Sequence, residues 1–525
     1  MLRFPRASCL LLLTTLAACG GGGGGGGGST MTGTGWTAGV FPAASNSAAR
    51  CAMPRTGTDP YTGKAYPDHA GSVLYENNWL RSWSNDLYLW YSEILDQDPG
   101  TFTTTALYFK ALKTTATTAS GAAKDKFHFT YDTAQWEALS QSGTSAGYGP
   151  QWEILGDGRP PRDVRIAWVE GSAPASASEA SLARGAQVLA VDGADLVNGS
   201  TTPIVDTLNA GLFPAAAGET HTFSVTGPGA LGQRTVTLVS ANVTPASVRG
   251  VQALAQPGGT VGYMQFNDHL ATSEGQLVSA FTTLANAGVT DLVLDIRYNG
   301  GGYLDIASEV AYMVAGATRT AGKTFELTQF NAKHPSTDPV TGAAIAPVGF
   351  LSMTQGFSTT SGAALPTLNL GRVYVLTGGG TCSASEAIIN SLRGIGVDVV
   401  QVGSTTCGKP YGFYPQDNCG TTYFSIEFRG VNAAGFGDYT DGFTPANSGL
   451  SVAAGAQVPG CSVGDDFSHD LGDPAESRLA AALGYRINST CPVASGLAPR
   501  QLVQQRPQDG MALERPAVRE IRLLR

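Results

Sequence analysis

The sequence has 525 residues, of which 42% are apolar and only 14% are charged, and its formal net charge is −9. This length allows two to four domains, and so little charge excludes a chain kept disordered by charge repulsion. The 32 Lys and Arg are outnumbered by 41 Asp and Glu and form no long basic run, so we expect no nucleic-acid partner.

The first 19 residues have the layout of an export signal. Two arginines precede an apolar run over 7–18 that is too short to span a membrane. The run ends in Leu-Ala-Ala-Cys, which resembles the lipobox of bacterial lipoproteins and implies a lipid anchor at Cys19; a plain secretory signal is the alternative. In Gram-negative lipoproteins, a residue other than Asp after the lipidated Cys implies sorting to the outer membrane, and here that residue is Gly20. We therefore expect an exported, periplasmic, lipid-anchored protein.

The next segments predict a tether and then a helical unit. Residues 20–69 begin with nine glycines and are expected to form a flexible tether with an irregular lead-in. Aromatic and aliphatic residues recur at helical spacing between 79 and 94, and a second helix is predicted over 104–115. We expect a helical N-terminal domain at 70–142.

From residue 143 the pattern changes to short strands. Strands are predicted near 152–155, 164–169, 187–191, 220–226 and 234–240, with a helical stretch near 178–183. The series, with RGAQVLAVDG in its middle, resembles a PDZ domain. The resemblance implies a PDZ-like domain at 143–245, with a carboxylate-capturing loop at Gly147, Tyr148 and Gly149, beside Pro150, which lacks an N–H. A β-rich domain with an ordinary turn is the alternative.

Residues 250–490 alternate strand and helix, which predicts an α/β core with helices packed on a sheet. Strands are predicted at 261–266, 292–296, 373–377 and 397–402, and helices at 273–287, 304–314 and 385–394. Residues 491–525, rich in Pro, Arg and Gln, are expected to form a loose tail. The chain as a whole is predicted to be a multidomain α+β protein.

Two glycine-rich loops follow buried strands of this core, and a lysine lies downstream of both. The loops are RYNGGG at 297–302 and GGGTCSASE at 378–386, and Lys409 is the only lysine after residue 333. A serine at a strand-to-helix turn presents its hydroxyl where helix N–H groups stabilise an oxyanion. It needs a base to become a nucleophile, and a buried neutral lysine with a pKa of about 7–8 can serve.

Together these loops resemble the carboxyl-terminal processing, or tail-specific, proteases. The patterns D-x-R-x-N-x-G-G, G-x-x-S-A-S-E and G-K match 295–302, 380–386 and 408–409 in order, and the resemblance covers about residues 70–450. It implies a peptidase core of the ClpP/crotonase-like type acting on peptides or proteins, recruited through their C-termini, without a cofactor. The implied site residues are the nucleophile Ser383, the general base Lys409, and the oxyanion-hole N–H groups of Ala384, Gly301 and Gly302.

One position departs from the family pattern. Several members carry a Gln four residues after the lysine, which helps to orient it, and here that residue is Phe413. Gln416 lies nearby in the sequence. Ser385 and Glu386 are expected to begin and cap the following helix. Because the orienting Gln is replaced, the alternative function is an inactive, lipid-anchored module that binds a peptide or an apolar ligand on the same fold.

Other motifs carry less weight. The G-x-S-x-G at 143–147 is preceded by a predicted helical end and followed by a strand, the reverse of what an α/β-hydrolase needs. The six histidines lie in no motif, and neither C-x-x-C nor H-E-x-x-H occurs, so we expect no metal site. For an exported protein, Cys407–Cys419 and Cys461–Cys491 are the simplest disulfides, with the connectivity left open.

Overall fold

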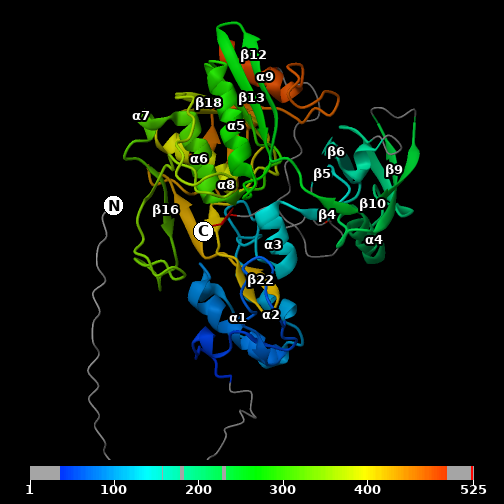
Figure 1. The fold of residues 1–525 in the computed structure, drawn as a ribbon, viewed down its shortest axis with the longest axis vertical. Coiled ribbons are helices and arrows are strands. Elements are labelled where there is room, and N and C mark those ends of the chain that lie inside the picture. The colour runs from blue at the N-terminus through cyan, green and yellow to red at the C-terminus, as the bar shows by residue number, and fades with distance from the viewer. Residues whose placement is uncertain are drawn as a thin grey trace, which may run out of the picture.

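A computed structural model describes residues 36–156, 158–177, 182–227 and 232–492, together with residue 513 and residues 522–523 (Figure 1). The predicted export signal with Cys19 and the glycine run lie outside the described residues, as does most of the helical stretch predicted near 178–183. Within the described part of the chain, no helix is long and apolar enough to cross a membrane.

The core is a six-stranded sheet with the order β12-β13-β14-β18-β19-β26. Its strands are β12 (Val248–Gln256), β13 (Gly259–Phe266), β14 (Asp291–Asp295), β18 (Arg372–Thr377), β19 (Asp398–Gly403) and β26 (Gly460–Ser462). Every neighbouring pair is parallel except β12 with β13. The four strands predicted for this region are confirmed as β13, β14, β18 and β19.

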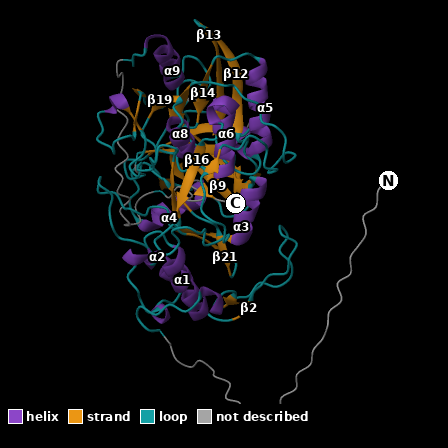
Figure 2. Ribbon diagram, turned by 90° about the vertical axis from the view of Figure 1, so that its left-hand side faces the viewer, coloured by secondary structure: helices purple, strands orange, loops and turns teal. Residues whose placement is uncertain are grey.

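Helices cover both faces of this sheet (Figure 2). One face packs against α5 (Ser273–Asn286), α6 (Leu304–Ala315) and α8 (Ala384–Gly394), and the other packs against α9 (Ser477–Asn488). Leu292 and Leu294 of β14 lie in the first layer and Val293 lies in the second, because successive strand residues point to opposite faces. Burial on both faces explains the unbroken apolar run of β14. The three helices predicted here are confirmed.

A second sheet lies within the range predicted for the PDZ-like domain. Its order is β10-β9-β7-β6-β5, all antiparallel, with β8 on β7. The strands are β5 (Pro150–Leu155), β6 (Asp163–Val169), β7 (Gln187–Val191), β8 (Ala194–Asp195), β9 (Thr220–Thr226) and β10 (Arg234–Val239). A helix that patterning did not predict, α4 (Thr202–Leu212), packs on it through Leu208 and Leu212. We call residues 145–243 the β-rich domain.

The N-terminal part has the predicted helices but is joined to the core. Its helices are α1 (Val73–Leu87), α2 (Thr105–Ala111) and α3 (Thr133–Ser142). The helical pattern between 79 and 94 belongs to α1 only as far as Leu87, and the helix predicted over 104–115 ends at Ala111. Helix α3 was predicted only as a helical end before residue 143. Strand β3 (Phe129–Asp132) pairs with β22 (Thr421–Phe424), which forms a hairpin with β21 (Gln416–Asn418). The stacked rings of Trp79 and Trp83 pack against Tyr423 of that hairpin.

Smaller pairings complete the fold. Strands β17, β16, β23 and β20 form a sheet, and β4 pairs with β11. The bounds are β4 (Ser145–Gly147), β11 (Ala241–Val243), β16 (Thr324–Gln329), β17 (Val348–Gly349), β20 (Tyr411–Gly412) and β23 (Phe428–Val431). Further short elements are β1 (Arg50–Cys51), β2 (His69–Ala70), α7 (Ala317–Thr320), β24 (Thr444–Pro445) and β25 (Gln457–Val458).

The disulfides are Cys51–Cys419, Cys382–Cys407 and Cys461–Cys491. The predicted pair Cys461–Cys491 is confirmed, and the predicted pair Cys407–Cys419 is wrong. Cys419 lies at the tip of the β21–β22 hairpin, which extends to the N-terminal part and places its sulfur beside Cys51. Cys407 instead follows β19 and lies beside Cys382, the residue before Ser383.

Candidate active site

The candidate site lies where three neighbouring parallel strands end. Strands β14, β18 and β19 are adjacent, so the loops that follow them leave the same edge of the sheet. Hydrogen bonds tie the loops together: Cys382 N–H donates to Asn299 O at 3.0 Å, and Cys407 N–H donates to Thr381 O at 3.0 Å. The topology therefore gathers the three motifs that are far apart in sequence.

Ser383 begins α8 in a strained conformation. Its φ is +62° and its ψ is −114°, in a region that residues with a Cβ rarely adopt. The side chain is fully buried, and its Oγ has no hydrogen-bond partner among the described residues. A strained backbone at a fully buried serine is the kind of outlier from which a functional role can be inferred.

Lys409 lies in the loop after β19, and its side chain is fully buried. The Nζ atom is 4.5 Å from the ring centre of Phe127 and 4.4 Å from that of Phe413. Two aromatic rings thus flank the amine, and one of them, Phe413, stands where several relatives of the resembled family carry Gln. Gln416 does not replace that Gln, because it belongs to β21 and its amide donates to Asp417 O.

Glu386 joins the loop of the serine to the loop of the lysine. Its Oε2 accepts the Ser383 N–H at 2.9 Å and the Lys409 N–H at 2.8 Å, so the two backbone nitrogens lie no farther apart than the sum of these distances. Its Oε1 accepts the Gly408 N–H and the Thr406 hydroxyl. Burial raises the pKa of Glu386, and these four hydrogen bonds oppose that rise. Glu386 therefore caps α8, as predicted, and also binds the backbone of the loop that carries Lys409.

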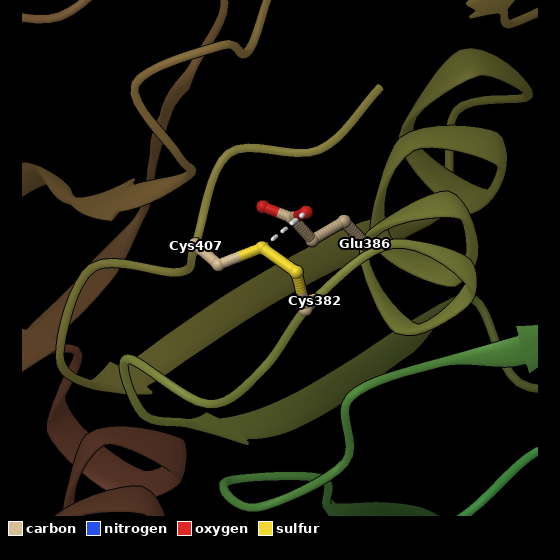
Figure 3. A group of neighbouring side chains, drawn as sticks. All are labelled: Cys382, Glu386 and Cys407. Atoms are coloured by element: carbon tan, nitrogen blue, oxygen red, sulfur yellow. Dashed lines mark hydrogen bonds between the residues drawn. A yellow bond between two sulfur atoms is a disulfide. The ribbon is translucent and has the colours of Figure 1, made fainter. Parts of the chain in front are cut away.

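A disulfide clamps the same two loops (Figure 3). Cys382 and Cys407 are bonded with their Cα atoms 5.1 Å apart, and Cys407 Sγ lies 3.5 Å from Glu386 Oε2. Among the described residues, these three side chains are the one group of Cys, His, Asp or Glu close enough to hold a metal ion. A cysteine binds a metal ion as the thiolate, and both sulfurs here are bonded to each other in the disulfide. The group in this form therefore does not fit a metal ion.

Three backbone N–H groups were expected to form the oxyanion hole. Ala384 is the first helical residue of α8, and no described residue accepts its N–H. The Gly301 N–H already donates to Asn299 Oδ1 at 3.0 Å, so it is not a free donor in this structure. In β15 (Gly302–Tyr303), Tyr303 N–H donates to His269 O, which leaves the Gly302 N–H facing the opposite side. The oxyanion-hole role of Ala384 and Gly302 stays a prediction.

Patterning missed His269, which lies under the glycine loop and is fully buried. Its Nδ1 is 3.0 Å from Asn299 Oδ1, while Asn299 Nδ2 donates to Phe266 O. Because Asn299 Oδ1 only accepts, His269 carries its proton on Nδ1, and Nε2 has no partner among the described residues. Burial lowers the pKa of His269 to about 3. A lone His after a strand gives no sequence signal for this role.

A large cavity separates the β-rich domain from the core loops. Its volume is about 1540 Å³, and its lining includes the predicted carboxylate-binding residues Gly147, Tyr148 and Gly149 together with Gly300 and Gly380 of the core loops. Gly149 has a φ of +99°, and a Cβ there would lie 2.1 Å from that of Ala173. The loop predicted to capture a carboxylate and the loops of the candidate site therefore open onto one space.

The rival motifs do not form sites. The G-x-S-x-G at 143–147 follows α3 and leads into β4, so helix precedes strand, as predicted, and no nucleophile turn exists there. His128 stacks on Phe109 with ring centres 3.7 Å apart, and burial lowers its pKa to about 4. It is a packed core residue whose side chain is buried beside Phe109.

Comparisons with known proteins agree with this geometry. Residues 260–412 match peptidase family S41. Over 206 residues the chain is 29% identical to the chloroplastic C-terminal processing peptidase of Tetradesmus obliquus, which covers 36% of this chain and 42% of that protein, so the match spans less than half the length of this relative.

One solved structure extends the likeness in fold to most of the chain. An S41 protease from Bacteroides fragilis is 22% identical, covers 81% of this chain and 100% of its own, and superposes with a TM-score of 0.57. A photosystem II D1 C-terminal processing protease is 21% identical, covers 72% of this chain and 92% of its own, and has a TM-score of 0.43. Because Ser383, Lys409 and all three loops lie within 260–412, this chain contains a peptidase family S41 domain that includes its candidate active site.

Proposed function

We propose that the protein is a serine endopeptidase in which Ser383 is the nucleophile and Lys409 is the general base. The observation that carries the proposal is the shared carboxylate oxygen of Glu386, which holds the backbone of both residues. The strained conformation of Ser383, its unbonded hydroxyl and the buried amine of Lys409 support the same roles. The S41 domain match and the relative named as a processing peptidase add to them.

The proposed reaction follows from these roles. The uncharged Lys409 amine takes the proton of the Ser383 hydroxyl as Oγ bonds to the scissile carbonyl carbon. The carbonyl oxygen becomes negative and receives hydrogen bonds from the Ala384 and Gly302 N–H groups. The Lys409 ammonium then gives its proton to the leaving amine as the C–N bond breaks. Water, deprotonated by the same amine, releases the acyl group and restores Ser383.

The substrate is proposed to be a peptide or protein recruited through its C-terminus. The β-rich domain, which resembles a PDZ domain, would bind the terminal carboxylate at 147–149, and the shared cavity would lead the chain to the site. A ClpP/crotonase-like core, lipid anchorage through Cys19 and a periplasmic, outer-membrane location belong to the same proposal. They rest on the resemblances in the sequence.

A second candidate function is favoured by one observation. Ser383 and Lys409 are both fully buried, and Phe413 stands where several relatives have Gln. An inactive module that only binds peptides would show the same features. A labelled peptide with an apolar C-terminus separates the two functions, because binding without cleavage supports the module.

The deciding experiment uses a casein-like unfolded substrate in long incubations, with products identified by mass spectrometry. Ser383→Ala and Lys409→Arg are each expected to lower cleavage by at least about 1,000-fold without changing the melting temperature, because each removes one half of the dyad. Ser391→Ala, a buried serine elsewhere on α8, is the matched control and should cleave normally. An unimpaired Lys409→Arg protein would end the dyad proposal.

A further inference from the structure

Part of the segment expected to be a loose tail lies in the candidate site. Strand β27 (Arg522–Leu523) pairs in parallel with β15, with Gly302 opposite Arg522 and Tyr303 opposite Leu523. Leu523 also forms a parallel bridge with Phe413. The strand therefore runs between the loop of Gly302 and the segment that follows Lys409, on the side that the Gly302 N–H faces.

The Leu523 side chain fills an apolar position next to the nucleophile loop. It is 1% exposed and belongs to a buried cluster with Cys382, Tyr411 and Phe413. Cys382 is the residue before Ser383, and Phe413 contacts the Lys409 amine. Main-chain pairing with one buried side chain is the way in which an extended peptide docks on a strand edge.

A second described residue of the same segment contacts the β-rich domain. The Leu513 N–H donates to Gly158 O at 3.1 Å, and its side chain is 5% exposed in that domain's core cluster. Leu513 also lines the cavity onto which the 147–149 loop, Gly300 and Gly380 open. The segment thus makes contact at the β-rich domain and, ten residues later, at the candidate site.

We propose that this segment is an internal competitor of the substrate. It docks in the groove between β15 and Phe413 in the place of a substrate strand, and Leu523 occupies the subsite that selects an aliphatic side chain. A tethered segment acts at a high effective concentration, so a free peptide competes poorly with it. The effect of this segment on cleavage rests on the proposed function, but its docking in the groove can be measured without catalysis.

The first experiment measures docking in the Ser383→Ala background, where no cleavage occurs. The probe is a fluorescent peptide that copies residues 513–525. Adding Leu523→Asp to the protein should empty the groove and tighten probe binding by at least about tenfold, because the internal segment no longer competes. Ile487→Asp, at an aliphatic residue that is 59% exposed on α9, is the matched control and should bind as the parent does. A probe whose own Leu523 is replaced by Asp should not bind.

Two outcomes of this binding experiment would overturn the proposal: equal affinity with and without Leu523→Asp, and no probe binding to either protein. The second experiment adds Leu523→Asp to the protein with Ser383 intact and follows casein cleavage. We expect kcat/KM to rise by at least about tenfold. If the probe binds as expected and neither protein cleaves, the proposed peptidase function fails while the docking stands. If Ser383-dependent cleavage occurs at the same rate in both, the function stands and the competitor role fails.

Discussion

At the scale of single residues, the site depends on groups that hold backbone atoms in place. His269 and Asn299 hold the glycine loop: Asn299 Oδ1 accepts both the Gly301 N–H and the Nδ1–H of His269. Only a neutral His269 fits this site, because a second proton on Nε2 would have no acceptor among the described residues. The loop is therefore coupled to the protonation of one buried imidazole.

This coupling gives a pH dependence of stability. The pKa of His269 falls from 6.5 to about 3 on folding, so between these values the unfolded chain binds a proton that the folded protein does not. The contribution of His269 to the free energy of unfolding is therefore complete above pH 6.5 and is lost as the pH falls toward 3. Between pH 7 and pH 5 the wild type should lose about 2 kcal/mol more than His269→Gln in urea unfolding. Parallel losses in the two proteins would show that His269 does not titrate on unfolding.

At the scale of elements, three strand ends and one helix start build the site, and two cross-links hold them. The Glu386 carboxylate binds the backbone of the lysine loop, and the Cys382–Cys407 disulfide bonds that loop to the turn before α8. Phe413 stands where several relatives of the resembled family carry the Gln that helps to orient the lysine. We infer that here the loops, and not a side-chain amide, hold Lys409 near Ser383.

The disulfide can be tested against a matched pair in the same protein. Cys382 and Cys407 are 25 residues apart, and Cys461 and Cys491 are 30 apart, so removing either bridge should cost a similar stability of about 3–4 kcal/mol. Only the Cys382→Ala/Cys407→Ala protein should also lose peptidase activity, by at least about tenfold, because only its loops carry the site. Equal activities of the two double variants, measured on casein well below their melting temperatures, would contradict a positioning role for Cys382–Cys407.

Sequence patterning predicted the features that depend on residues close together in the chain, such as buried strands and the loops that follow them. Strands buried on both faces read as apolar runs, and the glycine loops that follow them marked 297–302 and 378–386. It did not predict α4, whose Gly and Asn lower helix propensity and whose N-cap Thr201 makes no capping hydrogen bond through its side chain. The Cys51–Cys419 bridge and the burial of Leu513 and Leu523 depend on contacts across hundreds of residues, which no local pattern records.

At the scale of the whole molecule, the β-rich domain and the core share a buried ionic junction. Arg184, from the β-rich domain, donates to Asp465 at 2.8 Å, to His469 O at 2.9 Å and to the Tyr298 hydroxyl at 3.0 Å. Three buried arginines lower the pKa of Asp465, so its carboxylate remains charged in this junction. Tyr298 precedes Asn299, and the junction therefore reaches the glycine loop of the site.

This arrangement predicts that docking of the β-rich domain stabilises the glycine loop. Arg184→Met keeps the length and the buried methylenes but removes the hydrogen bonds that Arg184 itself donates to Asp465, His469 O and Tyr298. Amide hydrogen exchange over 298–302 should accelerate by about tenfold or more, equivalent to about 1.4 kcal/mol of local stability. Arg165→Met, which removes a half-exposed arginine of the same domain, should leave that exchange unchanged. Exchange over 298–302 that stays at the wild-type rate in Arg184→Met would mean that the loop is held by the core alone, through Asn299 and His269.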